Sequence, residues 1–241
     1  MQSGIDSDLE EGPYYRINPV KGSARARAIR LIGKNKRVLE IGTCRGFLAE
    51  PLAKLGNTIT GIEIDIDPVA GECAERYYER IVTGEVKLLN LDQYFHTGEF
   101  DCILLLDVLD RLTSPENILK KIRRYISGHG FIVVSIPNFC HGNVILDLMS
   151  GNFHSNRIIQ QHPAKIRFFS LKSIAELFSE AGYDILELER VKRNVGLSAH
   201  TGTKERIPDL ILSILKEIPD SDSYEYVIKA RPADNPIKLI V

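Results

Sequence analysis

The chain has 241 residues, of which 44% are hydrophobic and 26% are charged, and its formal net charge is −1. A chain of this length and composition can bury a substantial core, and we expect it to form one globular domain. The balanced charge disfavours the basic surface on which nucleic-acid-binding proteins depend, so no nucleic-acid partner is expected. No apolar run approaches the roughly 18 residues that a membrane-spanning helix needs, so no membrane partner is expected either.

The cysteines and the first residues indicate the compartment. The four cysteines form no C-x-x-C pair, which disfavours both a zinc site and a disulfide framework. No metal centre is therefore expected. The N-terminus is acidic and lacks the basic start and apolar core of a signal peptide. We expect a cytoplasmic protein with reduced thiols, and nothing in the sequence indicates its oligomeric state.

The polar residues 1–22 are expected to form an N-terminal arm or cap, and residues 23–241 a single domain. From residue 37 onward, strand-like apolar runs alternate with helical patterns. After a helix at 23–32, strands are expected at 37–41, 58–63, 86–89, 101–107, 131–136, 184–191 and 224–230. Further helices are expected at 46–55, 68–82, 115–126, 142–150, 171–182 and 204–216. This alternation predicts an α/β fold with a doubly wound sheet and helices on both faces.

The most informative stretch is 37–46, where an apolar strand runs into a turn that contains Gly42 and Gly46. Glycines at a strand-to-helix turn allow a ligand to approach the backbone, since no side chain blocks it. The helix that follows presents free N–H groups to such a ligand. Glu40, at the strand end, can hold a positively charged group. An acid beside open backbone donors suits an amino-acid zwitterion better than a pyrophosphate.

The next predicted strand ends in Glu63, at a position from which an acid can accept hydrogen bonds from both hydroxyls of a ribose. A dinucleotide-binding turn that begins at Gly42 would need further glycines at positions 44 and 47. The chain has Cys44 and Phe47 at those positions. The nicotinamide interpretation therefore loses its main support.

Four motifs, in order, resemble those of class I S-adenosylmethionine-dependent methyltransferases. Glu40–Gly46 is similar to their first motif, and Gly61–Glu63 is similar to their second. Phe100–Leu109 resembles their fourth strand, and Gly128–Asn138 resembles their turn and fifth strand. The likeness covers roughly residues 12–232. It implies a Rossmann-like, mostly parallel seven-stranded sheet, with the last strand inserted antiparallel.

Two short segments narrow the resemblance. The segments 136–138 (Ile-Pro-Asn) and 167–170 (Arg-Phe-Phe-Ser) are similar to those of a branch of small-molecule O-methyltransferases. The resemblance implies S-adenosylmethionine as the methyl donor, S-adenosylhomocysteine as the product and a small-molecule acceptor. The reaction is an in-line displacement that needs no metal, and holding donor and acceptor in line is its main requirement. The acceptor atom is expected to be a hydroxyl oxygen.

The donor site that the resemblance implies is assembled from strand ends. Gly42 and Gly46 would hold the methionine end against the backbone, while Glu40 would meet its ammonium group. Glu63 would accept hydrogen bonds from the ribose hydroxyls. The complete predicted donor-binding set is Glu40, Gly42, Thr43, Cys44, Gly46, Glu63, Ile64, Asn90, Leu91 and Asp107.

Two members of the predicted donor set have competing interpretations. Asn90 holds the place of an acid that contacts the adenine in related families, but Asp92 competes for this role and an Asx turn is the structural alternative. Asp107 would touch the methionine end, or it would instead cap the loop that follows its strand.

The acceptor site is expected in an insertion at 138–170, because ligands in such sheets bind beyond the carboxyl ends of the strands. The alternative is a helical hairpin that merely caps the sheet. His141 is the candidate catalytic base, ahead of His154 and His162, although a lone histidine in a loop is more often structural. The predicted acceptor-binding residues are Tyr15, Arg111, Asn138 and Arg167.

Two departures from the family pattern leave a rival function open. Cys44 replaces the middle glycine of the first motif, and Arg111 stands where relatives usually carry a histidine. Both changes favour a non-catalytic module that binds the donor or a partner. A nucleic-acid or protein methyltransferase is a weaker alternative, because residues 107–110 lack the Asn/Asp-Pro-Pro-Tyr signature of many such enzymes.

Overall fold

The computed structural model describes residues 21–43, 46–64, 76–151, 166–196 and 208–234. Within this part of the chain, seven strands form one sheet in the order β3-β2-β1-β4-β5-β7-β6. β7 runs antiparallel to both of its neighbours, β5 and β6, and the other pairs are parallel. The predicted fold, with its antiparallel last strand, is confirmed. The strands are β1 (Arg37–Ile41), β2 (Thr58–Glu63), β3 (Tyr78–Thr83), β4 (Phe100–Leu106), β5 (Ile126–Pro137), β6 (Tyr183–Lys192) and β7 (Ser223–Pro232).

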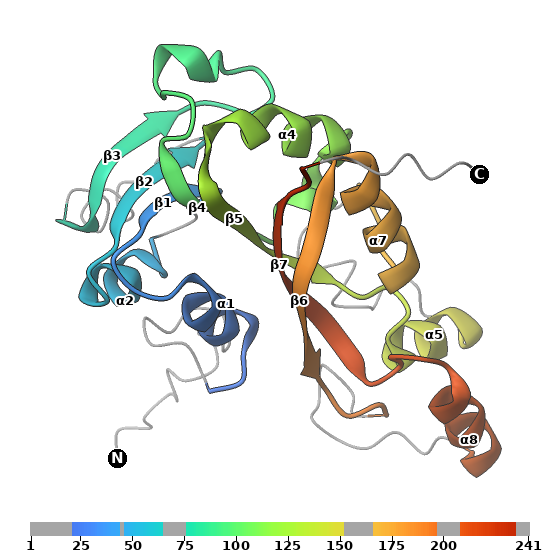
Figure 1. Cartoon of the computed structure of the whole chain (residues 1–241). Coiled ribbons are helices and arrows are strands. Elements are labelled where there is room, and N and C mark those ends of the chain that lie inside the picture. The colour runs from blue at the N-terminus through green and yellow to red at the C-terminus, as the bar shows by residue number, and fades with distance from the viewer. Residues whose placement is uncertain (1–20, 44–45, 65–75, 152–165, 197–207, 235–241) are drawn as a thin grey trace, which may run out of the picture.

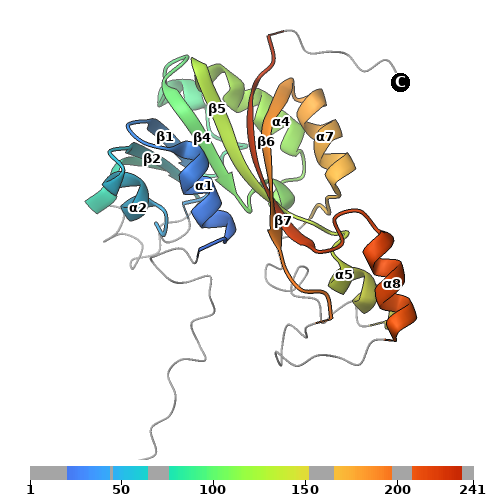
Figure 2. The same ribbon diagram turned by 60° about the horizontal axis from the view of Figure 1, so that its bottom comes forward.

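Helices lie on both faces of this sheet (Figure 1). The α-helices are α1 (Ala24–Ile32), α2 (Ala49–Lys54), α4 (Pro115–Ile122), α5 (Gly142–Met149), α7 (Leu171–Glu180) and α8 (Asp209–Glu217). Short 3-10 turns in the described part of the chain are η2 (Leu91–Gln93), η3 (Leu109–Arg111) and η4 (Arg123–Tyr125). Figure 2 shows α5 and α8 close together, near the end of β5 and the beginning of β7. No helix among the described residues is long and apolar enough to cross a membrane.

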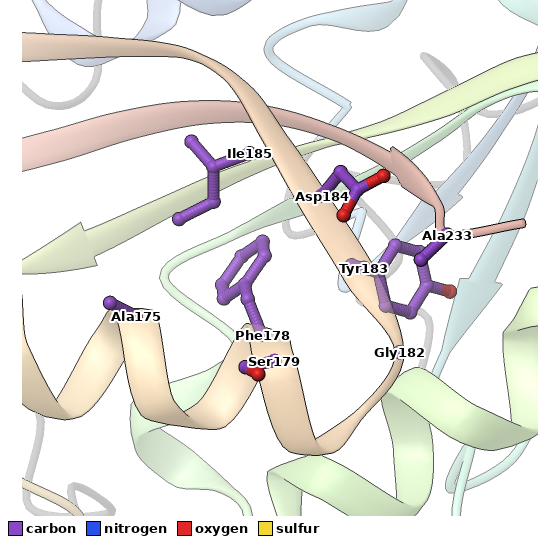
Figure 3. Close-up of a pocket in the computed structure, with 8 residues that line it drawn as sticks. All are labelled: Ala175, Phe178, Ser179, Gly182, Tyr183, Asp184, Ile185 and Ala233. Atoms are coloured by element: carbon purple, nitrogen blue, oxygen red, sulfur yellow. The ribbon is translucent and has the colours of Figure 1, made fainter. Parts of the chain in front are cut away.

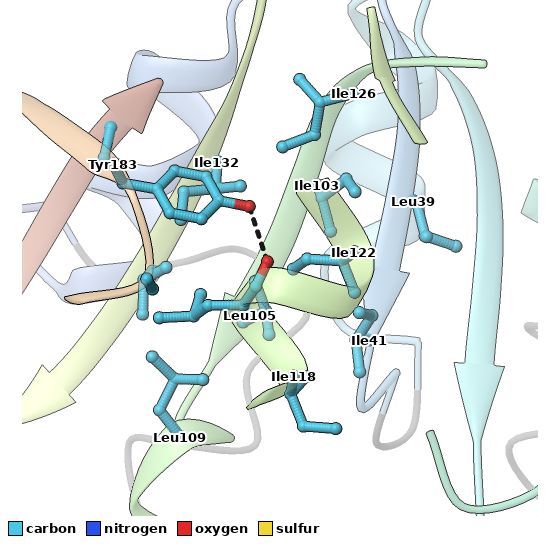
Figure 4. Packing of buried hydrophobic residues seen from close by; sticks show 14 of the residues in the cluster. Leu39, Ile41, Ile103, Leu105, Leu109, Ile118, Ile122, Ile126, Ile132 and Tyr183 are labelled. Carbon is cyan, nitrogen blue, oxygen red and sulfur yellow. Dashed lines mark hydrogen bonds between the residues drawn. The ribbon is translucent and has the colours of Figure 1, made fainter. Parts of the chain in front are cut away.

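The sheet separates two apolar layers, and the side chains of β4 divide between them. Ile103 and Leu105 join the cluster that includes α4 and α7, whereas Cys102 and Leu104 join the cluster that includes α1 and α2. Such burial on both faces is typical of a central parallel strand. Figure 4 shows the first cluster, in which the Tyr183 hydroxyl donates a 2.9 Å hydrogen bond to the carbonyl oxygen of Leu119.

The third strand lies earlier in the chain than predicted. β3 occupies Tyr78–Thr83 and pairs in parallel with β2, so the strand predicted at 86–89 is wrong. The backbone N–H groups of Leu88 and Leu89 donate instead to the carbonyl oxygen of Glu85, which makes this stretch a turn.

The helix predicted at 68–82 is wrong at its C-terminal end for the same reason. Apolar residues at helical spacing conceal the β-branched run Ile81–Thr83, whose side chains favour a pleated strand. Pairing with β2 satisfies the backbone groups of this run and decides between the two structures. Residues 65–75, where the predicted helix begins, lie outside the described residues.

The remaining differences concern element ends. α4 ends at Ile122 and continues as the 3-10 turn η4, so the helix predicted at 115–126 is shorter than expected. β5 consequently begins at Ile126, earlier than predicted, and its pairing with β4 shifts register near its beginning. Tyr15 and most of the predicted arm at 1–22 lie outside the described residues. The boundaries of the arm, the domain and the insertion at 138–170 stay predictions.

Candidate active site

The carboxyl ends of β1, β2 and β4 meet at one edge of the sheet, because these neighbouring strands run in parallel. The register pairs Glu40 of β1 with Gly61 of β2 and with Leu104 of β4. The chain therefore leaves these three strands at adjacent points. Glu63 ends β2, and Asp107 follows β4 directly. The sequence placed these acids at strand ends, and the register explains why they lie near one another.

The turn after β1 is built so that only glycine fits at its first position. Gly42 has a φ of +77°, in the left-handed region, and its N–H donates a 2.9 Å hydrogen bond to the carbonyl oxygen of Ile62. A Cβ at Gly42 would lie 2.9 Å from Cγ2 of Val108, which follows Asp107. Gly46 is also left-handed and donates from its N–H to the Thr43 carbonyl oxygen at 2.9 Å. Cys44 lies outside the described residues.

Glu63 is held in a defined position at the end of β2. One of its carboxylate oxygens, Oε2, accepts a 3.2 Å hydrogen bond from the Thr43 hydroxyl. The other oxygen, Oε1, accepts a 2.8 Å hydrogen bond from the backbone N–H of Ile64. The Ile64 side chain is 66% exposed at this edge. The carboxylate thus stands where the sheet ends, and a carboxylate can accept more hydrogen bonds than these two.

Glu40 is an acid inside the protein, with only 4% of its surface exposed. The Tyr78 hydroxyl donates a 2.7 Å hydrogen bond to its Oε2 atom. Burial raises the pKa of Glu40 to about 7, against the opposing effects of the Tyr78 hydrogen bond and the Arg25 charge, while Glu63 adds to the rise. The carboxyl is therefore close to half ionised at neutral pH.

Asp107 adopts an uncommon backbone conformation at the end of β4. Its φ of +53° lies in the left-handed region, which few residues other than glycine occupy. Ser135 of β5 stabilises it twice, because its Oγ accepts the Asp107 N–H at 3.1 Å and its hydroxyl donates to Oδ1 at 3.3 Å. The sequence analysis did not predict a role for Ser135, although its position as the single polar residue in an apolar strand could have indicated one.

The structure separates Asn90 and Leu91 from the other predicted donor residues. Because β3 ends at Thr83, the residues at the strand end are Gly84 and Glu85. The Gly84 N–H donates a 2.7 Å hydrogen bond to the Glu63 carbonyl oxygen. Gly84 therefore lies beside the edge of the sheet at which Glu40, Gly42, Glu63 and Asp107 lie, which we call the donor edge. Asn90 is exposed before η2, and the Leu91 side chain is buried in the core.

Asp92, the alternative to Asn90, makes contacts that indicate a structural role. It accepts a 2.6 Å hydrogen bond from the Tyr125 hydroxyl and pairs with Arg124 at 3.0 Å. Sequence reasoning missed Gly84 and Glu85 because the third strand was misplaced. The sequence does contain a pattern that indicates this strand end: a glycine directly follows the β-branched run of β3, as Gly42 follows the apolar run of β1.

Asn138 ties the end of β5 to the start of β7. Its side chain is fully buried, and its Nδ2 donates to the carbonyl oxygens of Asp220 at 3.1 Å and Ser223 at 2.8 Å. Its Oδ1 accepts the N–H of Cys140 at 2.9 Å. These three bonds use the side-chain amide within the protein. The geometry favours a structural role for this side chain over the predicted contact with the acceptor.

His141 is the N-cap of α5. Its Nδ1 accepts the N–H of Asn143 at 3.3 Å, and its Nε2 lies 3.3 Å from the carbonyl oxygen of Arg193, to which it can donate a hydrogen bond. Burial lowers the pKa of His141, so the neutral ring is favoured at neutral pH. With 1% exposure and both ring nitrogens engaged, the geometry favours a capping role over the predicted role of catalytic base.

The segment before α7 lies against the end of β5 and against η3. Asn138 and Phe169 form a parallel bridge, and the Phe139 and Phe168 ring centroids are 4.5 Å apart. Arg167 donates from its backbone N–H to the Asp110 carbonyl oxygen at 3.0 Å, and from its guanidinium to the Thr113 carbonyl oxygen.

These contacts bring two predicted acceptor residues into one neighbourhood, although they are distant in sequence. Arg111 follows Asp110 directly, and both Arg111 and Arg167 are exposed. The backbone of Arg167 is therefore bonded to the residue that precedes Arg111, and we call these two exposed residues the arginine pair.

A hollow of about 290 Å³ lies away from this edge, between α7 and the start of β6 (Figure 3). Phe178, Gly182 and Asp184 are among the residues that line it. Because β6 runs in the same direction as β5, its first residues lie at the opposite edge of the sheet from the acids. The hollow is therefore separate from the candidate active site. In the described part of the chain, no group of three or more His, Cys, Asp or Glu residues is placed to hold a metal ion.

The buried acid yields a prediction about stability. Since the folded state holds a proton on Glu40 up to about pH 7, whereas an ordinary glutamate loses it near 4.5, wild-type stability falls as pH rises through this window. This difference corresponds to about 3 kcal/mol at most. Glu40→Gln should therefore become more stable than wild type at pH 8 but not at pH 4.5. Urea unfolding without ligand measures this, with exposed Glu176→Gln as the control. An equal pH dependence of wild type and Glu40→Gln would contradict the prediction.

The capping role of His141 yields a second prediction. Asparagine is a good N-cap, so His141→Asn should keep the unfolding temperature and the turnover number close to those of wild type. Loss of a catalytic base should instead lower turnover by roughly 10²–10⁴-fold. Turnover is measured on an acceptor identified by screening phenols and alcohols. A loss of that size in a variant with an unchanged unfolding temperature would restore His141 as the base.

Comparison with known proteins places the chain in a family. Residues 16–188 match the family described as a methyltransferase domain. The ubiquinone biosynthesis O-methyltransferase of Thiobacillus denitrificans is 25% identical over 192 residues, which are 78% of this chain and 81% of the relative.

Solved structures share the fold. An S-adenosylmethionine-dependent methyltransferase from Archaeoglobus fulgidus has a TM-score of 0.61 and 16% identity, over 87% of this chain and 91% of that one. The Burkholderia thailandensis 1,6-didemethyltoxoflavin N1-methyltransferase, solved with 1,6-didemethyltoxoflavin and S-adenosylhomocysteine, has a TM-score of 0.58 and 18% identity, over 89% and 80% of the two chains. Since the family match spans more than half of the sequence, the chain belongs to the class I S-adenosylmethionine-dependent methyltransferases.

Proposed function

We propose that this methyltransferase transfers the methyl group of S-adenosylmethionine to a hydroxyl oxygen of a small-molecule acceptor. The observation that carries the proposal is the meeting of Glu40, the Gly42 turn and Glu63 at adjoining strand ends. The choice of oxygen is supported by the likeness to a ubiquinone biosynthesis O-methyltransferase.

In this proposal the donor lies across the strand ends, with its ribose at Glu63. The methionine end lies toward β1 and β4, over the Gly42 turn, where Glu40 and Asp107 offer carboxylates to its ammonium group. The adenine lies toward β3, the next strand outward. Glu85, which follows Gly84 at the end of that strand, then replaces Asn90 as the candidate acceptor for the adenine amino group.

S-adenosylmethionine supplies an activated methyl group, which passes in line to the acceptor oxygen and leaves a neutral thioether. The chain's own contribution is chiefly position. The Gly42 backbone and the anchored Glu63 hold the donor, and holding it in line with the acceptor can lower the barrier by several kcal/mol. A base is needed only when the acceptor hydroxyl is still protonated at the start of the reaction. Since both ring nitrogens of His141 are engaged in hydrogen bonds, an acidic hydroxyl such as a phenol, which ionises more readily, fits this site best.

The arginine pair suggests the charge of the acceptor. Arg111 and Arg167 are exposed and joined through Asp110, on the side of the donor edge nearest the end of β5. A guanidinium cannot serve as a base in a protein, but it binds carboxylate or phosphate well. We therefore assign the arginine pair to a negatively charged group of the acceptor.

A second function stays open because of two residues. Cys44 and Arg111 depart from the pattern of the family, and both departures favour a module that keeps the donor without transferring its methyl group. Turnover of any acceptor in the screen decides against this alternative. The expected cytoplasmic location, and the absence of a nucleic-acid partner, also stay predictions.

The donor pose predicts a large effect at Glu63. Glu63→Ala should weaken binding of S-adenosylhomocysteine by about 10–100-fold, since hydrogen bonds to a charged group contribute about 1.5–3 kcal/mol. Calorimetric titration measures the dissociation constants of wild type, Glu63→Ala and the exposed-site control Glu176→Ala. Unchanged affinity in a folded Glu63→Ala variant would refute the pose.

The arginine pair predicts an effect on the acceptor alone. Arg111→Ala and Arg167→Ala should each raise KM for anionic acceptors by about tenfold, the scale of one charge-assisted hydrogen bond. Affinity for S-adenosylhomocysteine should stay unchanged, because neither residue lies in the donor pose. Phenols with and without a carboxylate provide the comparison. Equal changes in KM for charged and uncharged phenols would contradict the assignment.

A further inference from the structure

A buried hydrogen bond reaches across the sheet to the candidate donor site. The Tyr78 hydroxyl donates to Oε2 of Glu40 at 2.7 Å, and both residues are buried. Tyr78 begins β3 and Glu40 lies in β1, yet these strands are not neighbours, since β2 lies between them. The tyrosine ring therefore crosses β2 to reach the acid.

Gly61 makes this crossing possible. It is the residue of β2 that pairs with Glu40. A Cβ at Gly61 would lie 2.6 Å from Cγ2 of Thr43 and 3.2 Å from Cε1 of Tyr78. A side chain at this point would displace Thr43, which contacts Glu63, because real Cβ atoms do not come within 3.0 Å of another atom. It would also crowd the ring of Tyr78, which contacts Glu40. The bare backbone of Gly61 thus gives space to both contacts.

We propose that Tyr78 is a positioning residue for donor binding: its hydroxyl, passing over Gly61, holds the Glu40 carboxylate in the ionised form that receives the ammonium group of the donor. The inference rests on the proposed donor pose. It assigns a role to a tyrosine that lies outside the motifs of the strand ends, and it makes donor affinity depend on the protonation of one buried acid.

The groups that influence the ionisation of Glu40 come from three elements. Tyr78 of β3 and Arg25 of α1 favour the ionised carboxylate, while Glu63 of β2 disfavours it. Arg25 also lies over the Phe47 ring, 4.9 Å from its centroid, which keeps it close to the turn after β1. Burial raises the pKa of Glu40 to about 7 in spite of the two favourable contacts. Donor affinity should therefore rise as pH increases through 7, and removal of the Tyr78 hydroxyl should move that rise to higher pH.

The test is a calorimetric titration with S-adenosylhomocysteine between about pH 6 and pH 8.5. Wild type should bind more tightly as pH rises. Tyr78→Phe should bind about fivefold more weakly at pH 7, and the loss should shrink toward pH 8.5, because Glu40 is then ionised in both proteins. Glu40→Gln should bind weakly with little pH dependence. Tyr183→Phe is the matched control, since it removes a buried tyrosine hydroxyl bond of 2.9 Å far from the site.

A second measurement needs no ligand and supports or overturns the inference by itself. The carboxyl ¹³C signal of Glu40, assigned by its absence in Glu40→Gln, reports the titration of this acid directly. Its midpoint should be higher in Tyr78→Phe than in wild type, and unchanged in Tyr183→Phe. If Tyr78→Phe does not fold, 3-fluorotyrosine at position 78 keeps the ring and donates a stronger hydrogen bond. The midpoint should then move to lower pH.

The outcomes separate this inference from the proposed function. If Tyr78→Phe weakens binding equally at every pH, or leaves the Glu40 midpoint unchanged, the role of Tyr78 is overturned while the donor pose stands. If Glu40→Gln binds as tightly as wild type, Glu40 does not receive the ammonium group and the pose itself fails at this residue. A purely structural tyrosine would change the unfolding temperature without moving the pH profile.

Discussion

The parallel pairing of β1 between β2 and β4 is the contact on which the site depends. It sets Glu40 beside Gly61 on one side and Leu104 on the other, so that the chain leaves three neighbouring strands at adjacent points. A slip of one residue in this pairing would turn Glu40 to the opposite face of the sheet and remove it from Tyr78. Because the central strands are buried on both faces, such a slip would also disrupt two apolar layers. The core thus protects the geometry of the donor edge.

That geometry buries the carboxyl of Glu40 in β1, where its charge destabilises the fold. A carboxyl with 4% exposure is unfavourable as an anion, yet the proposed donor contact requires the anion. The Tyr78 hydrogen bond and the Arg25 charge lessen the penalty without removing it, since burial still raises the pKa of Glu40 to about 7. Asp107 shows a similar compromise, because its left-handed backbone is held by Ser135. Strain and buried charge at one edge are typical of sites that bind a ligand.

The strand ends that form the proposed donor site could be predicted from the sequence because their determinants are local. The Gly42 turn and Glu63 follow or end apolar strands, as expected from the sequence. β3 could not be placed from the sequence pattern alone, because its residues have helical spacing and become a strand only through pairing with β2. Since the third strand was predicted too late in the chain, Asn90 and Leu91 were included in the predicted donor-binding residues. The hydrogen bonds of Asn138 and His141 could not be predicted either, since their partners Ser223 and Arg193 are 85 and 52 residues away in the sequence.

The donor edge and the proposed acceptor side also differ in how they are built. The donor edge is built from strand ends whose neighbours in the sheet are fixed by the core, so it changes little without loss of the fold. On the proposed acceptor side, the Asn138 side chain joins the end of β5 to the start of β7, and a backbone bridge to Phe169 joins it to the segment at 166–169. Arg111 and Arg167 are exposed and take no part in the Asn138 contacts or in the donor edge, so they can change without disturbing either. If the arginine pair contacts the acceptor as proposed, a methyltransferase built in this way can keep one donor while its acceptor changes.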